Sequence, residues 1–108
     1  MDRHRLAEER SIAYHRVIAE RLATDPSVIR IARARVQRWL ASAGAVPAYA
    51  RAWDAVLALP RAELQAFLVD PGEKARELRQ STPFAGALAP RERWRIWREV
   101  GERARGAA

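Results

Sequence analysis

Cysteine is absent from this chain of 108 residues, and lysine and histidine are scarce. Without cysteine the chain forms no disulfide and carries out no thiolate chemistry, which fits a reducing cytoplasm. Its two histidines, His4 and His15, lie far apart in the sequence, about 16 Å along a helix, so they cannot share one metal ion. The five glycines never cluster into a phosphate-binding loop. We therefore expect no cofactor, no metal site, no catalytic residue and no enzymatic activity.

A long uninterrupted apolar run is also missing. Spanning a membrane takes roughly 18 or more consecutive apolar residues, and no segment of the sequence comes close. The N-terminal region carries charges at Asp2, Arg3 and Glu8, where a signal peptide would have its apolar core. These absences predict a soluble, cytoplasmic protein that does not bind a membrane.

The third absence is of alternating runs rich in β-branched residues, which are typical of strands. Hydrophobic residues make up 49% of the chain, and they recur at helical spacings of three and four. The sequence predicts an all-α fold, a compact bundle of five or six short helices in a single domain over residues 1–108, with a frayed tail at 105–108. The predicted helices span about 3–23, 27–42, 47–58, 61–69, 72–80 and 90–104.

Proline marks the predicted starts of three of these helices. Pro26, Pro71 and Pro90 each stand at a first helical position, where the missing N–H of proline costs nothing. Asp70, just before the second of these prolines, lies three residues before Glu73, which is the spacing of a capping box.

The apolar positions of the last predicted helix are Trp94, Ile96, Trp97 and Val100. We expect these four side chains to form the buried side of that helix, away from its arginines. No other large apolar side chain is available in this segment, so the expected docking of the helix depends on them.

The first predicted helix has apolar residues pointing in two directions. Tyr14, Val17 and Ile18 share one side, whereas Ile12 and Ala19 lie on another. One side is expected to face the core of the bundle. The other makes a homodimer through this helix one interpretation of the pattern.

Arginine supplies 19 of the 20 basic residues, and the formal net charge is +7. The excess is concentrated in residues 25–42 and 81–108, each of which sums to about +3 by counting side chains. A strongly basic protein attracts nucleic acids, anionic surfaces and acidic proteins. A GC-rich genome would also favour arginine and alanine through its codons, so the choice of arginine over lysine has two open explanations.

Seven residues are candidates for binding a partner, because they combine exposed guanidinium groups with apolar side chains at the basic helices and the segment before the last helix. They are Arg30, Ile31, Arg38, Phe84, Arg91, Arg95 and Arg98. Arginine and aromatic residues are enriched at the centres of protein interfaces, and the pattern favours an acidic protein partner. The first alternative is a nucleic-acid-binding protein that contacts phosphates through the same arginines. The second is that the two basic helices simply present solvated amphipathic faces, and that the apolar segment with Phe84 packs onto the protein's own core.

Arg10 and His15 have the R-x4-H spacing found in a class of helical ribonucleases. The pattern is short, and such pairs arise often by chance. A ribonuclease that uses these two residues is therefore a third interpretation of the sequence, behind the two binding functions.

Three parts of the chain resemble a known group of proteins. They are LRQSTPFAGALAPRERW at 78–94, AERLATDP at 19–26, and the pair Tyr49 and Trp53. Together they resemble short helical proteins of GC-rich bacteria that look like the antitoxin partners in toxin–antitoxin gene pairs. The resemblance implies a protein that binds and neutralises a cognate toxin. It carries no catalytic or DNA-binding motif, so no residue takes a role from it by position.

Overall fold

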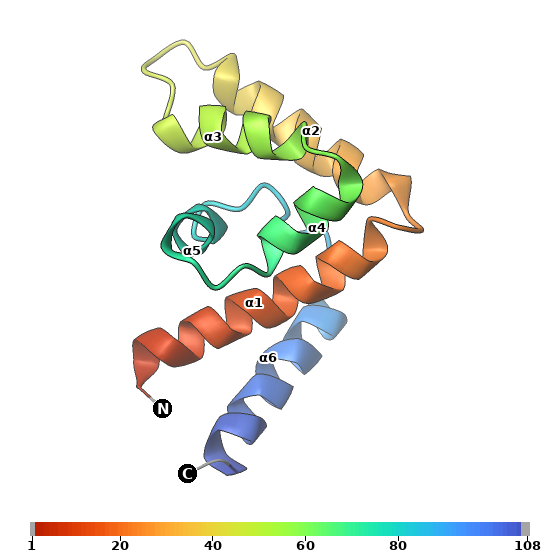
Figure 1. Cartoon of the computed structure of the whole chain (residues 1–108), viewed down its shortest axis with the longest axis vertical. Coiled ribbons are helices and arrows are strands. Elements are labelled where there is room, and N and C mark those ends of the chain that lie inside the picture. The colour runs from red at the N-terminus through yellow and green to blue at the C-terminus, as the bar shows by residue number, and fades with distance from the viewer. Residues whose placement is uncertain (1, 107–108) are drawn as a thin grey trace.

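Figure 1 shows the computed structural model of the chain, which describes residues 2–106. This part of the chain is helical and contains no strand, so the predicted all-α bundle of five or six helices is confirmed. Its helices are α1 (Arg3–Arg21), α2 (Pro26–Leu40), α3 (Ala48–Leu57), α4 (Arg61–Leu68), α5 (Glu73–Arg79) and α6 (Pro90–Gly106). No helix in the described range is long and apolar enough to cross a membrane.

Aspartates cap the first two helices. The Asp2 side chain accepts a hydrogen bond from the Arg5 backbone N–H at 2.8 Å. Asp25 caps α2 in front of Pro26 and accepts hydrogen bonds from the backbone N–H and the hydroxyl of Ser27. These two bonds lower the pKa of the Asp25 carboxyl below its usual value. The predicted start of α2 is therefore confirmed, with its physical cause.

The expected start of α5 at Pro71 is wrong. The helix begins two residues later, at Glu73, with Gly72 as its N-cap. Asp70 accepts a hydrogen bond from the Gly72 N–H at 2.8 Å, so its carboxylate closes a local turn and does not cap the helix. Both Asp-Pro pairs precede a helix, but only the first is directly at its start.

The end of α6 also differs from expectation. The helix continues through Arg105 to Gly106, whereas the sequence predicted an end at 104 and fraying from 105. Residues 107–108 of the expected frayed tail lie outside the described residues. Because the helix continues through Arg105, this residue lies on the same side of α6 as Arg91 and Arg98.

The long helix α1 lies between α4 and α6, while α2 and α3 pack together at the other end of the molecule (Figure 1). Ala19 is buried on the α4 side of α1, and its backbone carbonyl accepts a hydrogen bond from Gln65 of α4 at 2.8 Å. Both apolar directions of α1 are thus used within the chain, and Ile12 is already half-buried. The pattern that suggested a homodimer through this helix is explained by internal packing.

The core is built around two aromatic side chains, Trp53 of α3 and Phe84 of the segment before α6, both 0% exposed. Their ring centroids lie 6.1 Å apart in an edge-to-face arrangement. The Trp53 indole N–H donates to the Leu78 carbonyl at 3.0 Å. As a consequence, Phe84 is wrong as a partner-binding anchor: it is buried in the core together with Pro83 and Leu88 of the same segment.

Two polar side chains fasten the 81–89 segment to the bundle. The Tyr14 hydroxyl of α1 donates to the Phe84 carbonyl at 2.7 Å, and the Arg35 guanidinium of α2 donates to the Ala85 carbonyl at 2.6 Å. Directly after these two carbonyls, Gly86 adopts a φ of +81°, in the region that favours glycine. The segment thus connects α1, α2 and α6.

Candidate functional site

Several arginines serve the fold and are not free to bind a partner. Arg35 holds the 81–89 segment, with hydrogen bonds to the carbonyls of Pro83 and Ala85. Arg79 is buried and donates to the carbonyls of Leu68 and Asp70, at the end of α4. Its burial lowers the pKa of the guanidinium. Part of the arginine excess is therefore structural.

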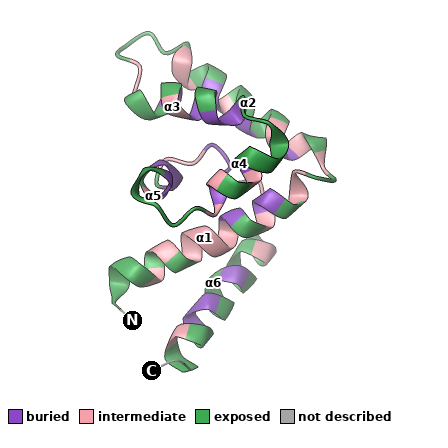
Figure 2. Cartoon of the chain, viewed as in Figure 1, coloured by how far each residue is buried: buried purple, intermediate pink, exposed green. Residues whose placement is uncertain are grey.

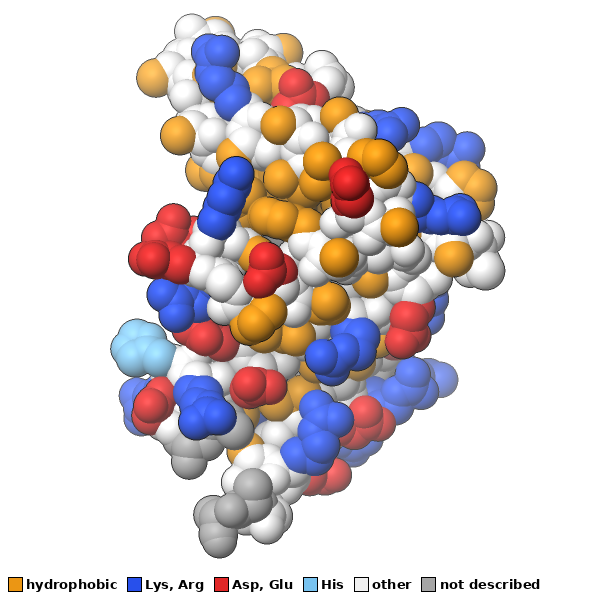
Figure 3. Space-filling view, in the orientation of Figure 1, with side chains coloured by type: hydrophobic (Ala, Val, Ile, Leu, Met, Phe, Trp, Pro, Cys, Tyr) orange, Lys and Arg blue, Asp and Glu red, His pale blue; other side chains and the backbone are white. Residues whose placement is uncertain are grey.

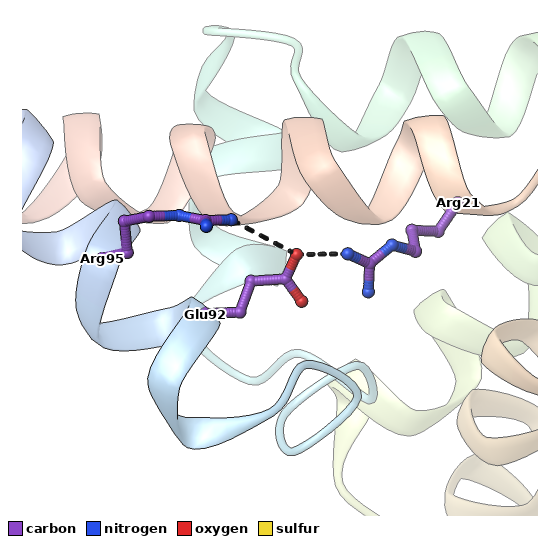
Figure 4. A network of polar contacts seen from close by, with 3 residues as sticks. All are labelled: Arg21, Glu92 and Arg95. Atoms are coloured by element: carbon purple, nitrogen blue, oxygen red, sulfur yellow. Dashed lines mark hydrogen bonds and ion pairs between the residues drawn. The ribbon is translucent and has the colours of Figure 1, made fainter.

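Glu92 of α6 binds two arginines at once, as Figure 4 shows. Its carboxylate forms an ion pair and hydrogen bond with Arg21 of α1. It also lies 3.9 Å from the Arg95 guanidinium, one turn further along α6. Arg95, a predicted binding residue, thus shares its carboxylate partner with Arg21. The network fixes the first turn of α6 against the last turn of α1.

The buried stripe of α6 is narrower than predicted. Ile96, Val100 and Gly101 are buried, whereas Trp94 and Trp97 are 56% and 44% exposed. Figure 2 shows this alternation of buried and exposed positions along the helix. Since α6 packs mainly on α1 and stands at the edge of the bundle, it has no second neighbour to cover its tryptophans. The expectation that all four apolar residues are buried is wrong for these two.

The two exposed tryptophans stack on each other. Their ring centroids lie 4.9 Å apart and the ring planes differ by 10°. The Arg10 guanidinium of α1 lies over the Trp97 ring, 3.5 Å from its centroid. One face of the Trp97 ring cannot accommodate both neighbours, so the guanidinium covers one face and the Trp94 indole the other. The resulting order is Arg10, Trp97, Trp94, and Trp94 ends the stack. We call these three residues the Arg–Trp–Trp stack.

Backbone contacts hold Arg10 in place. Its Nε donates to the Trp97 carbonyl at 3.2 Å. A Cβ atom at Gly101, one turn further along α6, would lie 2.8 Å from a terminal nitrogen of the guanidinium. The missing side chain of Gly101 leaves the space in which the Arg10 side chain crosses α6. The position of the Arg10 guanidinium on the Trp97 ring is thus fixed by residues of both α1 and α6.

The charges of α6 are separated around its circumference. At about 100° per residue, an arc of about 160° that includes both tryptophans contains four arginines and no acid. These arginines are Arg91, Arg93, Arg98 and Arg105. Within residues 2–106 none of the four forms an ion pair. The three glutamates of α6 all lie outside this arc, so the face that carries the Arg–Trp–Trp stack is strongly basic.

The other predicted binding residues lie on α2. Arg30, Ile31 and Arg38 are exposed, Ile31 to 43%. No ion pair involves these two arginines in the described part of the chain. However, α2 packs on α3 and α6 packs on α1, at different ends of the molecule (Figure 1). The structure therefore places three of the seven candidates on α2 and three on α6, two helices that pack on different neighbours, and Phe84 in the core.

His15 and Arg10 point to different sides of α1, so they are not a catalytic pair. His15 is 1% exposed, and its ring nitrogens contact the Ser11 carbonyl at 2.7 Å and the Thr82 hydroxyl at 2.8 Å. Burial lowers the pKa of this imidazole to about 4. A neutral, enclosed histidine is a structural group here and cannot exchange protons with bound RNA.

Two hollows on the surface are less distinctive. One, of about 130 Å³, is lined by His4, Ser11 and Arg79 and by the ion pair of Glu8 with Arg76 at 3.3 Å. The other is an open apolar hollow between α3 and α5, visible in Figure 3. Its rim carries one lysine and one glutamate, so it has no net charge to select a partner. Among residues 2–106 no group of three or more His, Cys, Asp or Glu side chains is placed to hold a metal ion.

Sequence reasoning missed Trp94, Trp97 and Arg10 as surface residues, although a signal existed. On a helical wheel, Trp94 lies about 140° from the midpoint of Ile96 and Val100. A single neighbouring helix covers a stripe of roughly 100° or a little more. Centring the stripe on the two aliphatic residues would have left Trp94 outside it. No sequence signal predicts that Arg10, from a distant helix, covers Trp97.

Comparison of the chain with models of protein families, with curated proteins and with solved structures finds no match.

Proposed function

We propose that this protein is a non-enzymatic, protein-binding subunit that neutralises a cognate toxin by covering an acidic surface of it. The observation that carries the proposal is the α6 face, where two stacked and exposed tryptophans lie among arginines that have no ion pair in residues 2–106. Tryptophan and arginine are the residues most enriched at the energetic centres of protein interfaces. The toxin-binding role is what the resemblance to antitoxin partners implies.

Leaving the α6 face exposed to water costs free energy, and binding of a partner would recover it. Trp94 and Trp97 leave much of their indole surface exposed, and burying apolar area contributes about 25 cal/mol per Å². The unpaired arginines raise the rate of encounter with an acidic surface, while burial of the indoles slows dissociation. Electrostatics and apolar contact thus act on the same partner at the same place.

Co-expression tests the proposal directly. The protein encoded next to this gene is produced alone and together with this chain. We expect growth arrest in the first case, and growth and a co-purifying complex in the second. Trp94→Ala combined with Trp97→Ala should restore the arrest, whereas Ile31→Ala on α2 should not. Continued arrest in the presence of the unaltered chain would contradict the proposal.

A second candidate function is binding of single-stranded nucleic acid, favoured by the open end of the Arg–Trp–Trp stack. Bases stack on exposed aromatic rings while arginines contact the phosphates. This function predicts that log K falls with log salt at about −0.7 per phosphate contacted. Titration of a labelled oligothymidylate at several salt concentrations measures the slope. Absence of binding at about 50 mM salt would exclude this candidate.

A further inference from the structure

We infer that the α6 face binds an amphipathic helix of the partner protein whose flanks are acidic. The inference rests on the proposed function, since it names the kind of surface that the partner presents. It follows from the spacing of apolar and basic residues along α6 and from the charges that this spacing leaves unpaired.

The exposed side of α6 has the seven-residue spacing of a helix that pairs with another helix. Trp94 and Gly101 are seven residues apart, as are Trp97 and Ala104. The two pairs alternate in steps of three and four, as the a and d positions of a heptad do. A partner helix lying along this seam would cover both exposed indoles. Gly101 is buried under the Arg10 guanidinium. In the second heptad the partner helix would therefore meet this cation and the half-buried Ala104.

A row of arginines runs beside this seam. Arg91, Arg98 and Arg105 follow each other at intervals of seven residues, which is about 10 Å along the helix axis. All three are exposed. In the heptad that places Trp94 at a, they occupy e, the position whose charges select the partner in paired helices. Acidic residues repeated every seven positions on a facing helix would match them one to one.

A second copy of this chain is a poor occupant of the same seam. In an antiparallel pair of α6 helices, e positions face e positions, so the arginine row would face itself. In a parallel pair the e row faces g, where α6 has Arg93 and Val100. Neither arrangement brings an acid to the three arginines, and like charges in facing positions are destabilising. The charge pattern thus selects a different, acidic chain.

The two tryptophans also favour a helix over a nucleic-acid strand. Because their rings are stacked on each other and Arg10 covers the outer face of Trp97, only the Trp94 end of the stack is free for a base. A platform for single strands presents separate aromatic faces to successive bases. A helix instead needs the edges and flanks of the rings as apolar contact area, and these are exposed.

A synthetic helix tests the inference without knowledge of the partner. The probe is a fluorescein-labelled peptide of three heptads with leucine at a and d and glutamate at e and g, since its own charges oppose self-pairing. A twin with lysine in place of every glutamate is the peptide control. An oligothymidylate of similar length is the nucleic-acid control. Fluorescence anisotropy at about 50 mM salt measures binding to the full chain.

Two charge reversals provide matched protein variants. Arg91→Glu with Arg98→Glu alters the α6 row, and Arg30→Glu with Arg38→Glu alters α2. Each pair lowers the formal net charge from +7 by the same amount. We expect the α6 pair to weaken binding of the glutamate peptide at least tenfold more than the α2 pair does. Trp94→Ala should also weaken it about tenfold, and Trp94→Phe should retain most of it.

Several results would overturn the inference. They are no binding of the glutamate peptide, equal binding of the lysine twin, tighter binding of the oligothymidylate, or equal losses for the two charge reversals. Circular dichroism of each variant confirms that the helices remain folded. If the cognate complex forms but is insensitive to the α6 variants, this inference fails while the proposed function stands. If no cognate complex forms, the proposed function itself fails.

Discussion

The helices α2 and α6 both carry an excess of positive charge but use their arginines differently. On α2, Arg35 reaches back to hold the 81–89 segment, and the exposed side offers only an isolated Ile31 as a large apolar group. On α6, the four arginines of the arc that includes Trp94 and Trp97 form no ion pair within residues 2–106, and the indoles themselves are exposed. Net charge alone therefore does not identify a binding surface.

Each of the two helices packs mainly on one other helix, and they differ in that α2 also contacts the 81–89 segment. The α2 helix is covered by α3 on one side and contacts the 81–89 segment through Arg35. The α6 helix packs mainly against α1, at the edge of the bundle. A helix with one neighbour buries one narrow stripe, so its remaining apolar residues stay exposed. These exposed residues are available to a partner.

The largest expected difference in the free energy of unfolding is between alanine variants of the buried Phe84 and of the exposed Trp94. Phe84→Ala should lower the free energy of unfolding by about 3–5 kcal/mol, because it opens a cavity beside Trp53. Trp94→Ala should change it by about 0.5 kcal/mol or less, since that ring contacts mainly Trp97 and solvent. Urea denaturation followed by circular dichroism measures both. Similar losses for the two variants would mean that the α6 tryptophans are structural.

Acidification should destabilise the core and leave the α6 face unchanged. The folded pKa of His15 is lowered to about 4 from an ordinary value of 6.5. Between these two pH values the unfolded chain therefore binds more protons than the folded one. The contribution of His15 to the free energy of unfolding is therefore fully present above pH 6.5. It falls by about 3 kcal/mol as the pH drops to 4, and it changes little below pH 4.

The His15→Gln variant isolates the contribution of this imidazole from that of the carboxylates. Although less stable at neutral pH, it should show a smaller loss of stability between pH 6.5 and 4 than the unaltered chain. The exposed His4→Gln variant should follow the unaltered chain. Denaturant midpoints at several pH values give the comparison, and identical pH profiles for all three proteins would refute the assignment.

Arginines of α2 should differ in their contributions to stability according to their contacts. Arg35→Ala removes hydrogen bonds to the Pro83 and Ala85 carbonyls and should cost about 1–3 kcal/mol. Arg38→Ala, one turn further along the same helix, should cost about 0.5 kcal/mol or less, as exposed substitutions usually do. Thermal unfolding compares the two. An equal cost would show that the 81–89 segment does not depend on Arg35.

The smallest expected effect on stability is at Gly101. Alanine there favours helix formation by about 1 kcal/mol, but its Cβ would displace the Arg10 guanidinium, which lies 2.8 Å away. The two effects oppose each other, so stability should change by less than about 1 kcal/mol. The near-ultraviolet circular dichroism of the stacked indoles should nevertheless change. Gly106→Ala, where nothing lies within 4 Å of the new atom, is the control and should leave that spectrum unaltered.

Much of the helical architecture could be read directly from the chain. The spacing of apolar residues placed all the helices to within a few residues, and Pro26 gave the start of α2. The pattern around Asp70 was misleading, because its carboxylate closes a turn to Gly72 before the helix begins. Local signals are reliable where the backbone hydrogen bonds are themselves local.

The candidate surface was predictable only in part. Arg91 and Arg98 were assigned correctly to the exposed side of the last helix, because a charged side chain is rarely buried without a partner. Phe84 and Trp94 were assigned the wrong way round: the first is in the core and the second at the surface. The helical wheel places Trp94 outside the aliphatic stripe of its helix, whereas no periodic pattern indicates that Phe84, in the segment before that helix, is buried.

The sequence by itself determined the helices and the sides on which their exposed arginines lie, since these depend on spacing and on interactions within a few residues. The tertiary structure decided which apolar residues are covered. It folded the segment around Phe84 inward between α1, α2 and α3, and it left α6 at the edge with one neighbour. It also brought Arg10 onto Trp97 across 87 positions of sequence. The burial of a side chain depends on what packs around its helix, and the periodicity of apolar residues along that helix does not predict this.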